Sequence, residues 1–127
     1  MSTNVAQTVA GALADRGVRF GFGIPGGALL QGIEALRTSG VDFVLVRHEG
    51  SAGFMADVVY QLTGSPGLCI GTLGPGVTNL VSPLAGAFLD RSRVLALTAQ
   101  CRTDLLGNYT HQILDQVAVI SPVCAAS

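Results

Sequence analysis

Charged residues are scarce in this sequence. Seven Lys and Arg and eight Asp and Glu make up 12% of its 127 residues, against about 25% in an average soluble domain. Apolar residues account for 49%, and large exposed apolar patches usually mark interfaces. We therefore expect a partner subunit, or sequence outside this chain, to cover much of the surface. A large core in a monomer is the alternative.

Basic clusters and long apolar runs are also missing. With a net charge of −1, the chain has no electrostatic footprint for nucleic acid or for an anionic membrane. No apolar run approaches the ~18 residues that a membrane span needs, and residues 1–20 lack the basic start and apolar core of a signal peptide. We expect a cytoplasmic protein with no nucleic-acid or membrane partner.

Cysteine is limited to Cys69, Cys101 and Cys124. Their number is odd and their spacing is too wide for a CxxC metal or redox site. We interpret them as ordinary thiols in a reducing compartment, and we predict no metal site. The length suits one domain, since single domains commonly run ~100–200 residues, and no repeat or linker marks a second.

Apolar runs alternate with helical patterns along the chain. A helix is predicted over residues 4–16, with Ser2, Thr3 or Asn4 as its N-cap. The later runs, such as "FVLV" and "VLAL", are continuously apolar, which is typical of parallel strands covered on both faces. We predict an α/β fold: a doubly wound, mainly parallel sheet with helices on both faces, in three layers α/β/α. The predicted strands are 20–24, 43–46, 68–72 and 94–98, and the helices follow at Leu29 to Leu36, at 50–63, at 76–90 and from Asp115.

Four segments fall at the carboxyl ends of these strands, where ligands bind in open α/β sheets. Each has a plain structural explanation, because glycine turns join strands to helices, an acid favours a helix N-terminus, and polar loops are usually solvated connections. No segment matches G-x-G-x-x-G or GxxxxGK[ST], so neither dinucleotide nor P-loop binding is indicated. The four are the turn "GIPGG" (23–27), Glu49, the turn "GPG" (74–76) and Gln100.

The joint order of these segments is more specific than any one of them. The succession "FGIPGG", "VRHEGSAGFMAD", "GTLGPGVTNLVS", "ALTAQ" and "HQILDQVAVISPV" resembles the N-terminal, pyrimidine-binding domain of thiamine-diphosphate enzymes, in the acetolactate synthase and benzoylformate decarboxylase group. The resemblance covers nearly the whole chain. It implies that residues 1–127 are one pyrimidine-binding domain, incomplete at its C-terminus.

The resemblance implies a catalytic role for Glu49. In the family this glutamate hydrogen-bonds the pyrimidine nitrogen N1′ of the cofactor. That bond favours the imino form of the 4′ amine, which takes the proton from the thiazolium C2. The resemblance also implies neighbours of two kinds. Those expected to bind the cofactor, with Glu49, are Pro25, Gly26, Gly74, Pro75 and Asn79. Those expected on the substrate side are Gln100, His111 and Gln112.

Two features depart from the family's pattern. The family's "FQE" segment here reads His111, Gln112, Ile113, so an acid is missing and a histidine replaces an aromatic residue. His111 is either a substrate-side acid or base or an ordinary surface residue. Pro83 falls inside the helix predicted for 76–90, where its ring should clash with the carbonyl of Asn79. We expect a kink that shifts Asn79.

A further departure concerns the rest of the cofactor. The family binds the diphosphate and magnesium through a GDG…NN motif in a separate domain, and this sequence contains no such motif. The resemblance therefore implies a diphosphate-binding domain or subunit as partner, in a homo- or hetero-oligomer, with thiamine diphosphate as cofactor and magnesium held by the partner.

The implied reaction is decarboxylation or carboligation of a 2-oxo acid, as in acetolactate synthase, and the choice between the two stays open. One alternative is a non-catalytic interaction domain, or a split-enzyme subunit that keeps the fold without independent activity. Another is an unrelated flavodoxin-like nucleotide binder, which rests on fold analogy alone.

Overall fold

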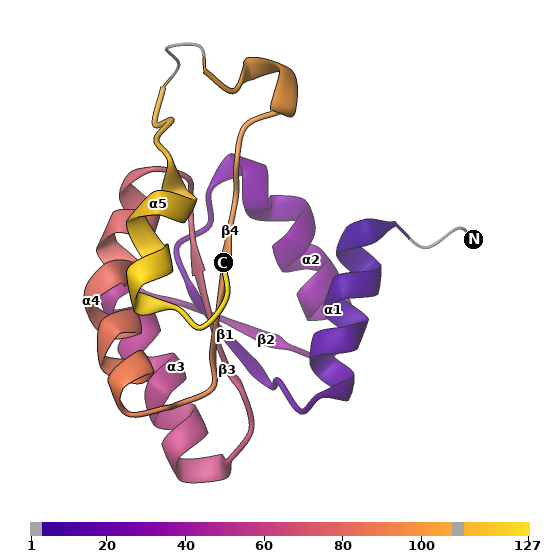
Figure 1. Cartoon of the computed structure of the whole chain (residues 1–127). Coiled ribbons are helices and arrows are strands. Elements are labelled where there is room, and N and C mark those ends of the chain that lie inside the picture. The colour runs from indigo at the N-terminus through magenta and orange to yellow at the C-terminus, as the bar shows by residue number, and fades with distance from the viewer. Residues whose placement is uncertain (1–3, 108–110) are drawn as a thin grey trace.

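A four-stranded parallel sheet forms the centre of the computed structural model, which describes residues 4–107 and 111–127 (Figure 1). Its strands are β1 (Phe20–Gly23), β2 (Asp42–Leu45), β3 (Gly67–Gly71) and β4 (Val94–Thr98), in the order β2-β1-β3-β4. All three pairings are parallel. The carboxyl ends of the strands therefore lie at one edge of the sheet, and the segments that follow them meet there.

Helices cover both faces of the sheet, as predicted. One apolar cluster joins helices α1 (Val5–Asp15) and α2 (Leu30–Thr38) to one face of the sheet through Leu68 and Ile70 of β3. The other joins α3 (Glu49–Thr63) and α4 (Pro75–Leu89) to the opposite face through Cys69, because neighbouring residues of a strand point to opposite faces. Figure 1 shows the two groups on either side of the strands. The three-layer α/β/α fold is confirmed.

The remaining elements are short. Helix α5 (Gln116–Ile120) packs with α4 on the second face. Single 3₁₀ turns lie at η1 (Gly27–Leu29), η2 (Thr103–Leu105) and η3 (Ser121–Val123). None of the helices in the described part of the chain is both long and apolar enough to cross a membrane.

The prediction that helices cover both faces of every strand is correct only for the central strands. All five residues of β3 are buried, and so are three of the four in β1. No residue of β2 or β4 is fully buried, and Leu45 and Leu95 are 67% and 42% exposed. These two strands lie at the edges of the described sheet, so their apolar residues lack neighbours that the sequence pattern led us to expect.

Capping residues set the helix ends close to the predicted ones. Asn4 caps α1 through a capping box with Gln7, whereas Ser2 and Thr3 lie outside the described residues. Helix α3 ends at Thr63 and is capped by Gly64, whose φ of 72° is a left-handed conformation that glycine adopts without strain. It begins at Glu49, one residue before the predicted start, and this difference brings the carboxylate into the first turn.

Pro83 lies inside helix α4 without ending it, and the expected kink that shifts Asn79 stays a prediction. Helix α4 is continuous from Pro75 to Leu89, and Pro83 is buried against Gly53 of α3, where a β-carbon would leave no room for the proline ring. The carbonyl of Asn79, which loses its usual partner to the proline, faces Gly50 of α3. The proline is thus accommodated by glycines on the neighbouring helix.

Burial makes Cys69 the least reactive of the three thiols. Its Sγ lies 3.5 Å from the carbonyl oxygen of Leu95, and burial raises its pKa to about 12. Burial also raises the pKa of Cys124, which is only partly covered. Because the thiolate is the reactive form, a thiol with a pKa near 12 stays protonated and inert over the neutral to mildly alkaline range.

We therefore expect a thiol reagent such as dithionitrobenzoate, at about pH 8, to modify two thiols in the folded chain, Cys101 faster than Cys124. Cys69 should react only after denaturant is added. Release of three equivalents of thiol at one rate from the folded chain would contradict this order.

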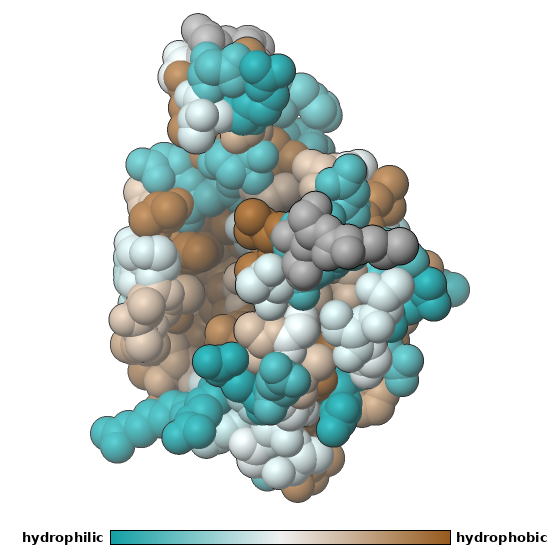
Figure 2. All heavy atoms as spheres, turned by 90° about the vertical axis from the view of Figure 1, so that its right-hand side faces the viewer, coloured by the Kyte–Doolittle hydropathy of each residue, from teal (hydrophilic) through white to brown (hydrophobic). Residues whose placement is uncertain are grey.

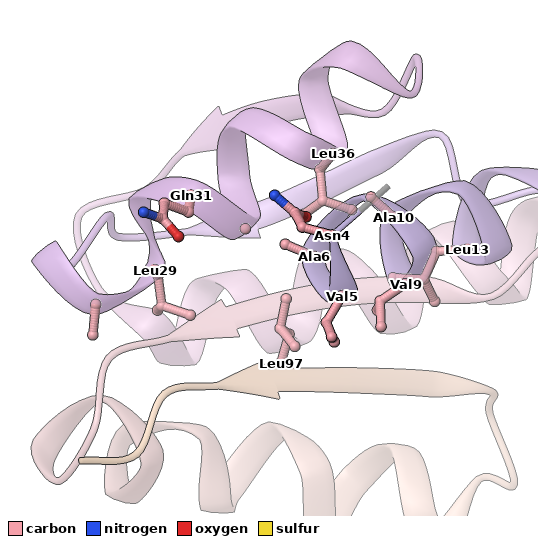
Figure 3. A pocket seen from close by; sticks show the side chains of 12 residues that line it. Asn4, Val5, Ala6, Val9, Ala10, Leu13, Leu29, Gln31, Leu36 and Leu97 are labelled. Carbon is pink, nitrogen blue, oxygen red and sulfur yellow. The ribbon is translucent and has the colours of Figure 1, made fainter. Parts of the chain in front are cut away.

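Two apolar grooves border the edge strand β4. One, of about 570 Å³, lies between α1, α2 and Leu97 of β4. Figure 2 shows apolar side chains lining a recess on the side of the molecule that carries α1, and in Figure 3 Val5, Val9 and Leu13 of α1 point toward β4. The second groove, of about 580 Å³, is lined by Leu95 together with residues of α4, α5 and the C-terminal segment, and Arg91 and Arg93 add two cationic side chains to its lining. No acid is among the described residues that line either groove, so neither offers a carboxyl group for acid–base chemistry.

Candidate functional site

Glu49 is a buried acid at the carboxyl edge of the sheet. It is the first residue of α3, shortly after β2 ends, and its side chain lies within the protein, since the residue is only 6% exposed. His48 caps the helix, because its Nδ1 accepts a hydrogen bond from the backbone N–H of Gly50 at 3.0 Å. The cap fixes the direction of the first helical turn and therefore the place of the carboxyl group.

Asn79 holds one oxygen of this carboxyl group. Its Nδ2 donates a hydrogen bond to Glu49 Oε2 at 2.9 Å, from the second turn of α4. The other oxygen, Oε1, points to the start of α4, where it lies 3.3 Å from the position that a β-carbon on Gly76 would occupy. Within the described residues no hydrogen bond reaches Oε1. The carboxyl group thus has one fixed oxygen and one that is available to a ligand.

Thr72 lies between the glycine turn after β1 and the glycine turn after β3. A β-carbon on Gly26 would lie 2.5 Å from Thr72 Oγ1, and one on Gly76 would lie 3.1 Å from Thr72 Cγ2. Gly26 belongs to the turn after β1, next to the exposed Pro25, and Gly76 to the first turn of α4. The turns after β1 and β3 therefore meet beside Glu49, which follows β2. Three strand ends contribute to one place, as the sequence predicts.

The segment around Gln112 lies on the turn that precedes α4. Gly74 caps α4 with a φ of 70°, and its missing β-carbon leaves room for the backbone carbonyl of Gln112. Gln112 itself has a φ of 63°, which is uncommon for a residue with a side chain. Pro75 follows as the first residue of the helix, where its missing N–H costs nothing.

Gln100 and His111 are not brought into this group. The side chain of Gln100 is exposed and turns back on its own loop, where Oε1 accepts from the backbone N–H of Cys101 at 2.9 Å. His111 is also exposed, and no hydrogen bond of the described residues joins it to Glu49 or Asn79. Their expected place on the substrate side stays a prediction.

Sequence reasoning missed two residues, Thr72 and Gln116. Thr72 is the first residue after a fully buried strand, a position at which ligands are commonly met, and this signal could have identified it. Gln116 is 6% exposed, and its Nε2 donates to the carbonyl oxygen of Ala99 at 2.9 Å. Nothing in the sequence around Gln116 indicates that its polar side chain is buried.

The arrangement can exchange a proton with a ligand that reaches the unbonded carboxyl oxygen of Glu49. Glu49 has one carboxyl oxygen without a hydrogen bond from the described residues, and the glycines at positions 26, 74 and 76 let Thr72, Gln112 and Glu49 pack closely against the adjoining backbone. Groups of three or more His, Cys, Asp or Glu that could hold a metal ion do not occur among residues 4–107 and 111–127.

Comparison with known proteins agrees with this geometry. Residues 3–119 match the family model for the thiamine pyrophosphate enzyme, N-terminal TPP binding domain. The chain is 42% identical over 118 residues to the probable acetolactate synthase large subunit of Methanocaldococcus jannaschii, with 93% of this chain and 20% of the relative covered. It is 42% identical over 119 residues to the acetolactate synthase isozyme 3 large subunit of Escherichia coli, with 93% and 21% covered.

The chain spans about a fifth of the length of these curated relatives. The match to the family model nevertheless extends over nearly the whole chain, including Glu49 and the glycine turns after β1 and β3. The chain therefore belongs to the thiamine pyrophosphate enzymes, as their N-terminal TPP-binding domain.

Proposed function

We propose that this chain binds the aminopyrimidine ring of thiamine diphosphate and that Glu49 activates it, in an acetolactate synthase-like enzyme that acts on a 2-oxo acid. The observation that carries the proposal is the buried carboxyl group, fixed through Oε2 by Asn79 and left free at Oε1 where the turns after β1 and β3 meet. The names of the relatives support the reaction class.

The residues present fit the pyrimidine end of this cofactor. Glu49 Oε1 has no hydrogen bond from the described residues. Gly26 and Gly76 let Thr72 and Glu49 lie close against the backbone, which places this free oxygen where the two turns meet. The diphosphate end is different, because no cluster of metal ligands occurs in the described residues. We propose that magnesium and the diphosphate are held by a partner domain or subunit with the GDG…NN motif.

When bound, thiamine diphosphate supplies a carbon nucleophile for the carbonyl group of the 2-oxo acid. The chain's own residues prepare the site. Glu49 Oε1 hydrogen-bonds the ring nitrogen and holds or returns a proton there. Asn79 keeps Oε2 in place and so fixes the orientation of the whole carboxyl group before the ring binds. The low exposure of Glu49, 6%, limits the access of water to the carboxyl group.

Further polypeptide is also part of the proposal. The relatives are about five times as long as the matched stretch, and β4 is an edge strand with an apolar groove on each side. An open edge of this kind is normally paired or covered. We propose that β4 is covered by polypeptide that corresponds to the unmatched part of these relatives, either continuous with this chain or in a partner. This polypeptide would extend the pyrimidine-binding domain.

Calorimetry tests the proposed function. Thiamine diphosphate with magnesium is titrated into this chain, into a partner polypeptide that carries GDG…NN, and into their mixture, which we call the assembled enzyme. We expect tight binding only in the assembled enzyme. In separate assays, only the assembled enzyme should consume pyruvate, and hydrogen exchange at the amides of β4 should be slower in it than in this chain alone. If no partner produces cofactor binding, the chain is a non-catalytic interaction domain and the proposal fails.

Asn79→Ala should reduce turnover by the assembled enzyme about tenfold, because a hydrogen bond contributes ~1–1.5 kcal/mol and about 1.4 kcal/mol corresponds to a factor of ten. Steady-state kinetics with pyruvate measure the effect. Ser82→Ala is the control, since Ser82 is an exposed residue on the same helix. Equal kcat values for the two variants would show that Asn79 does not position Glu49.

A further inference from the structure

Gln116 is a buried amide in which only one of the two polar side-chain atoms is hydrogen-bonded. Its Nε2 donates to the carbonyl oxygen of Ala99 at 2.9 Å, which joins the first residue of α5 to the residue just after β4. Its Oε1 is buried and has no partner within the described residues. The residue is 6% exposed, so the side chain as a whole lies inside the protein.

This half-satisfied amide contributes little to stability. A buried acceptor without a partner lowers the free energy of unfolding, and that loss offsets the gain from the bond to Ala99. A methionine has nearly the same reach; it removes the unpartnered Oε1 but leaves the buried Ala99 carbonyl without its bond, so the two effects oppose each other and stability should change little. The amide is therefore better explained by the position that its one hydrogen bond imposes on the chain.

The bond holds one end of the segment His111–Asp115. Asp115 caps α5 by accepting from the backbone N–H of Ala118 at 3.0 Å, so the segment ends where the Gln116 bond begins. Toward its other end, Gln112 takes a left-handed backbone conformation and lays its carbonyl against Gly74. Two points, at residues 112 and 116, thus fix the segment to the carboxyl edge of the sheet.

The contact at Gly74 leads directly to the site. Gly74 is the N-cap of α4, and the second turn of this helix carries Asn79, which holds Glu49 Oε2. A strained backbone at Gln112 persists only where its surroundings enforce it, and the Gln116 bond is the nearby constraint. Loss of that bond should free the segment without touching the carboxyl group.

We propose that Gln116 is a positioning residue: its hydrogen bond to Ala99 fixes the segment His111–Asp115 over the start of α4 and so shapes the side of the site where the 2-oxo acid enters. The part of this inference that concerns substrate rests on the proposed function. The part that concerns the segment does not, because it follows from contacts within the chain.

Gln116→Met tests the proposal in the assembled enzyme. We expect hydrogen exchange at the amides of residues 111–115 to become about tenfold faster, as a local constraint is lost. The KM for pyruvate should increase about three- to tenfold while kcat stays within about twofold, since substrate binding changes and the transition-state interactions do not. The melting temperature should change by less than about 3 °C. Val117→Ala, at the exposed next residue of α5, should leave all of these values unchanged.

Other outcomes overturn the proposal. If exchange in residues 111–115 stays at the wild-type rate, Gln116 does not hold the segment. If the melting temperature falls and KM and kcat change together, its role is structural only. Gln116→Leu provides a second apolar variant if the methionine variant does not fold. If the wild type binds no thiamine diphosphate, the proposed function fails, and the exchange measurement still decides whether Gln116 fixes the segment.

Discussion

Glu49→Gln is expected to lower kcat of the assembled enzyme by about 10²–10⁴-fold, the range typical of a lost general acid–base group. The amide keeps the shape of the side chain, and its carbonyl oxygen can still accept the hydrogen bond from Asn79. What it loses is the ability to give and take a proton at the ring nitrogen. Binding of thiamine diphosphate should therefore weaken far less than turnover, which calorimetry and steady-state kinetics with pyruvate measure together.

Glu34→Gln is the matched control for this variant. Glu34 is an exposed acid on α2 that pairs with Arg37 at 2.8 Å, and exposed pairs contribute only about 0–1 kcal/mol. We expect its kcat to equal that of the wild type. A Glu49→Gln enzyme with wild-type kcat would remove Glu49 from the mechanism, whatever its burial.

Gly67→Ala should cost about 3 kcal/mol or more of unfolding free energy, a large part of the roughly 5–15 kcal/mol that stabilises a typical domain. Gly67 begins β3, and a β-carbon there would collide with the backbone carbonyl of Ala56 in α3. Backbone cannot turn away as a side-chain tip can, so helix α3 must move off the sheet. Since α3 carries Glu49 at its first position, the same shift should impair the site.

Gly86→Ala provides the opposite expectation for the same chemical change. Apart from the neighbouring residues and backbone of its own helix, α4, nothing lies within 4 Å of a β-carbon built at Gly86. Alanine is the better helix former by about 0.5–1 kcal/mol, so this variant should be slightly more stable than the wild type. Thermal unfolding followed by circular dichroism compares the two. Equal melting temperatures for Gly67→Ala and Gly86→Ala would show that the close approach of α3 to β3 does not contribute to the stability of the fold.

The fold could be predicted because its signals are local and repeated. Apolar runs such as Leu68 to Ile70 alternate with helical patterns, and that alternation indicates a parallel sheet with covered faces. The edges could not be predicted in the same way. Leu45 and Leu95 are as apolar as the central residues, but their exposure depends on which strands lie outermost. Strand order is a property of the whole chain and cannot be predicted from one segment.

The meeting of Glu49 with two glycine turns at one edge was predictable, whereas the roles of these residues stay a prediction and the supporting contacts were missed. Glu49 and the glycine turns follow successive strands, so parallel topology brings them to one edge. The packing of the Pro83 ring against Gly53 was not predicted, because Gly53 lies on a different helix. The bond from Gln116 to Ala99 spans 17 residues and depends on where α5 packs, which no local pattern reveals.

The most direct test of the central claim is a crystal structure of the assembled enzyme with thiamine diphosphate and magnesium bound. We predict that Glu49 Oε1 lies about 2.6–3.0 Å from the pyrimidine nitrogen N1′, a normal hydrogen-bond distance, with Asn79 still bonded to Oε2. A pyrimidine ring bound elsewhere, or a Glu49 carboxyl group more than about 4 Å from N1′ and turned to solvent, would contradict the account.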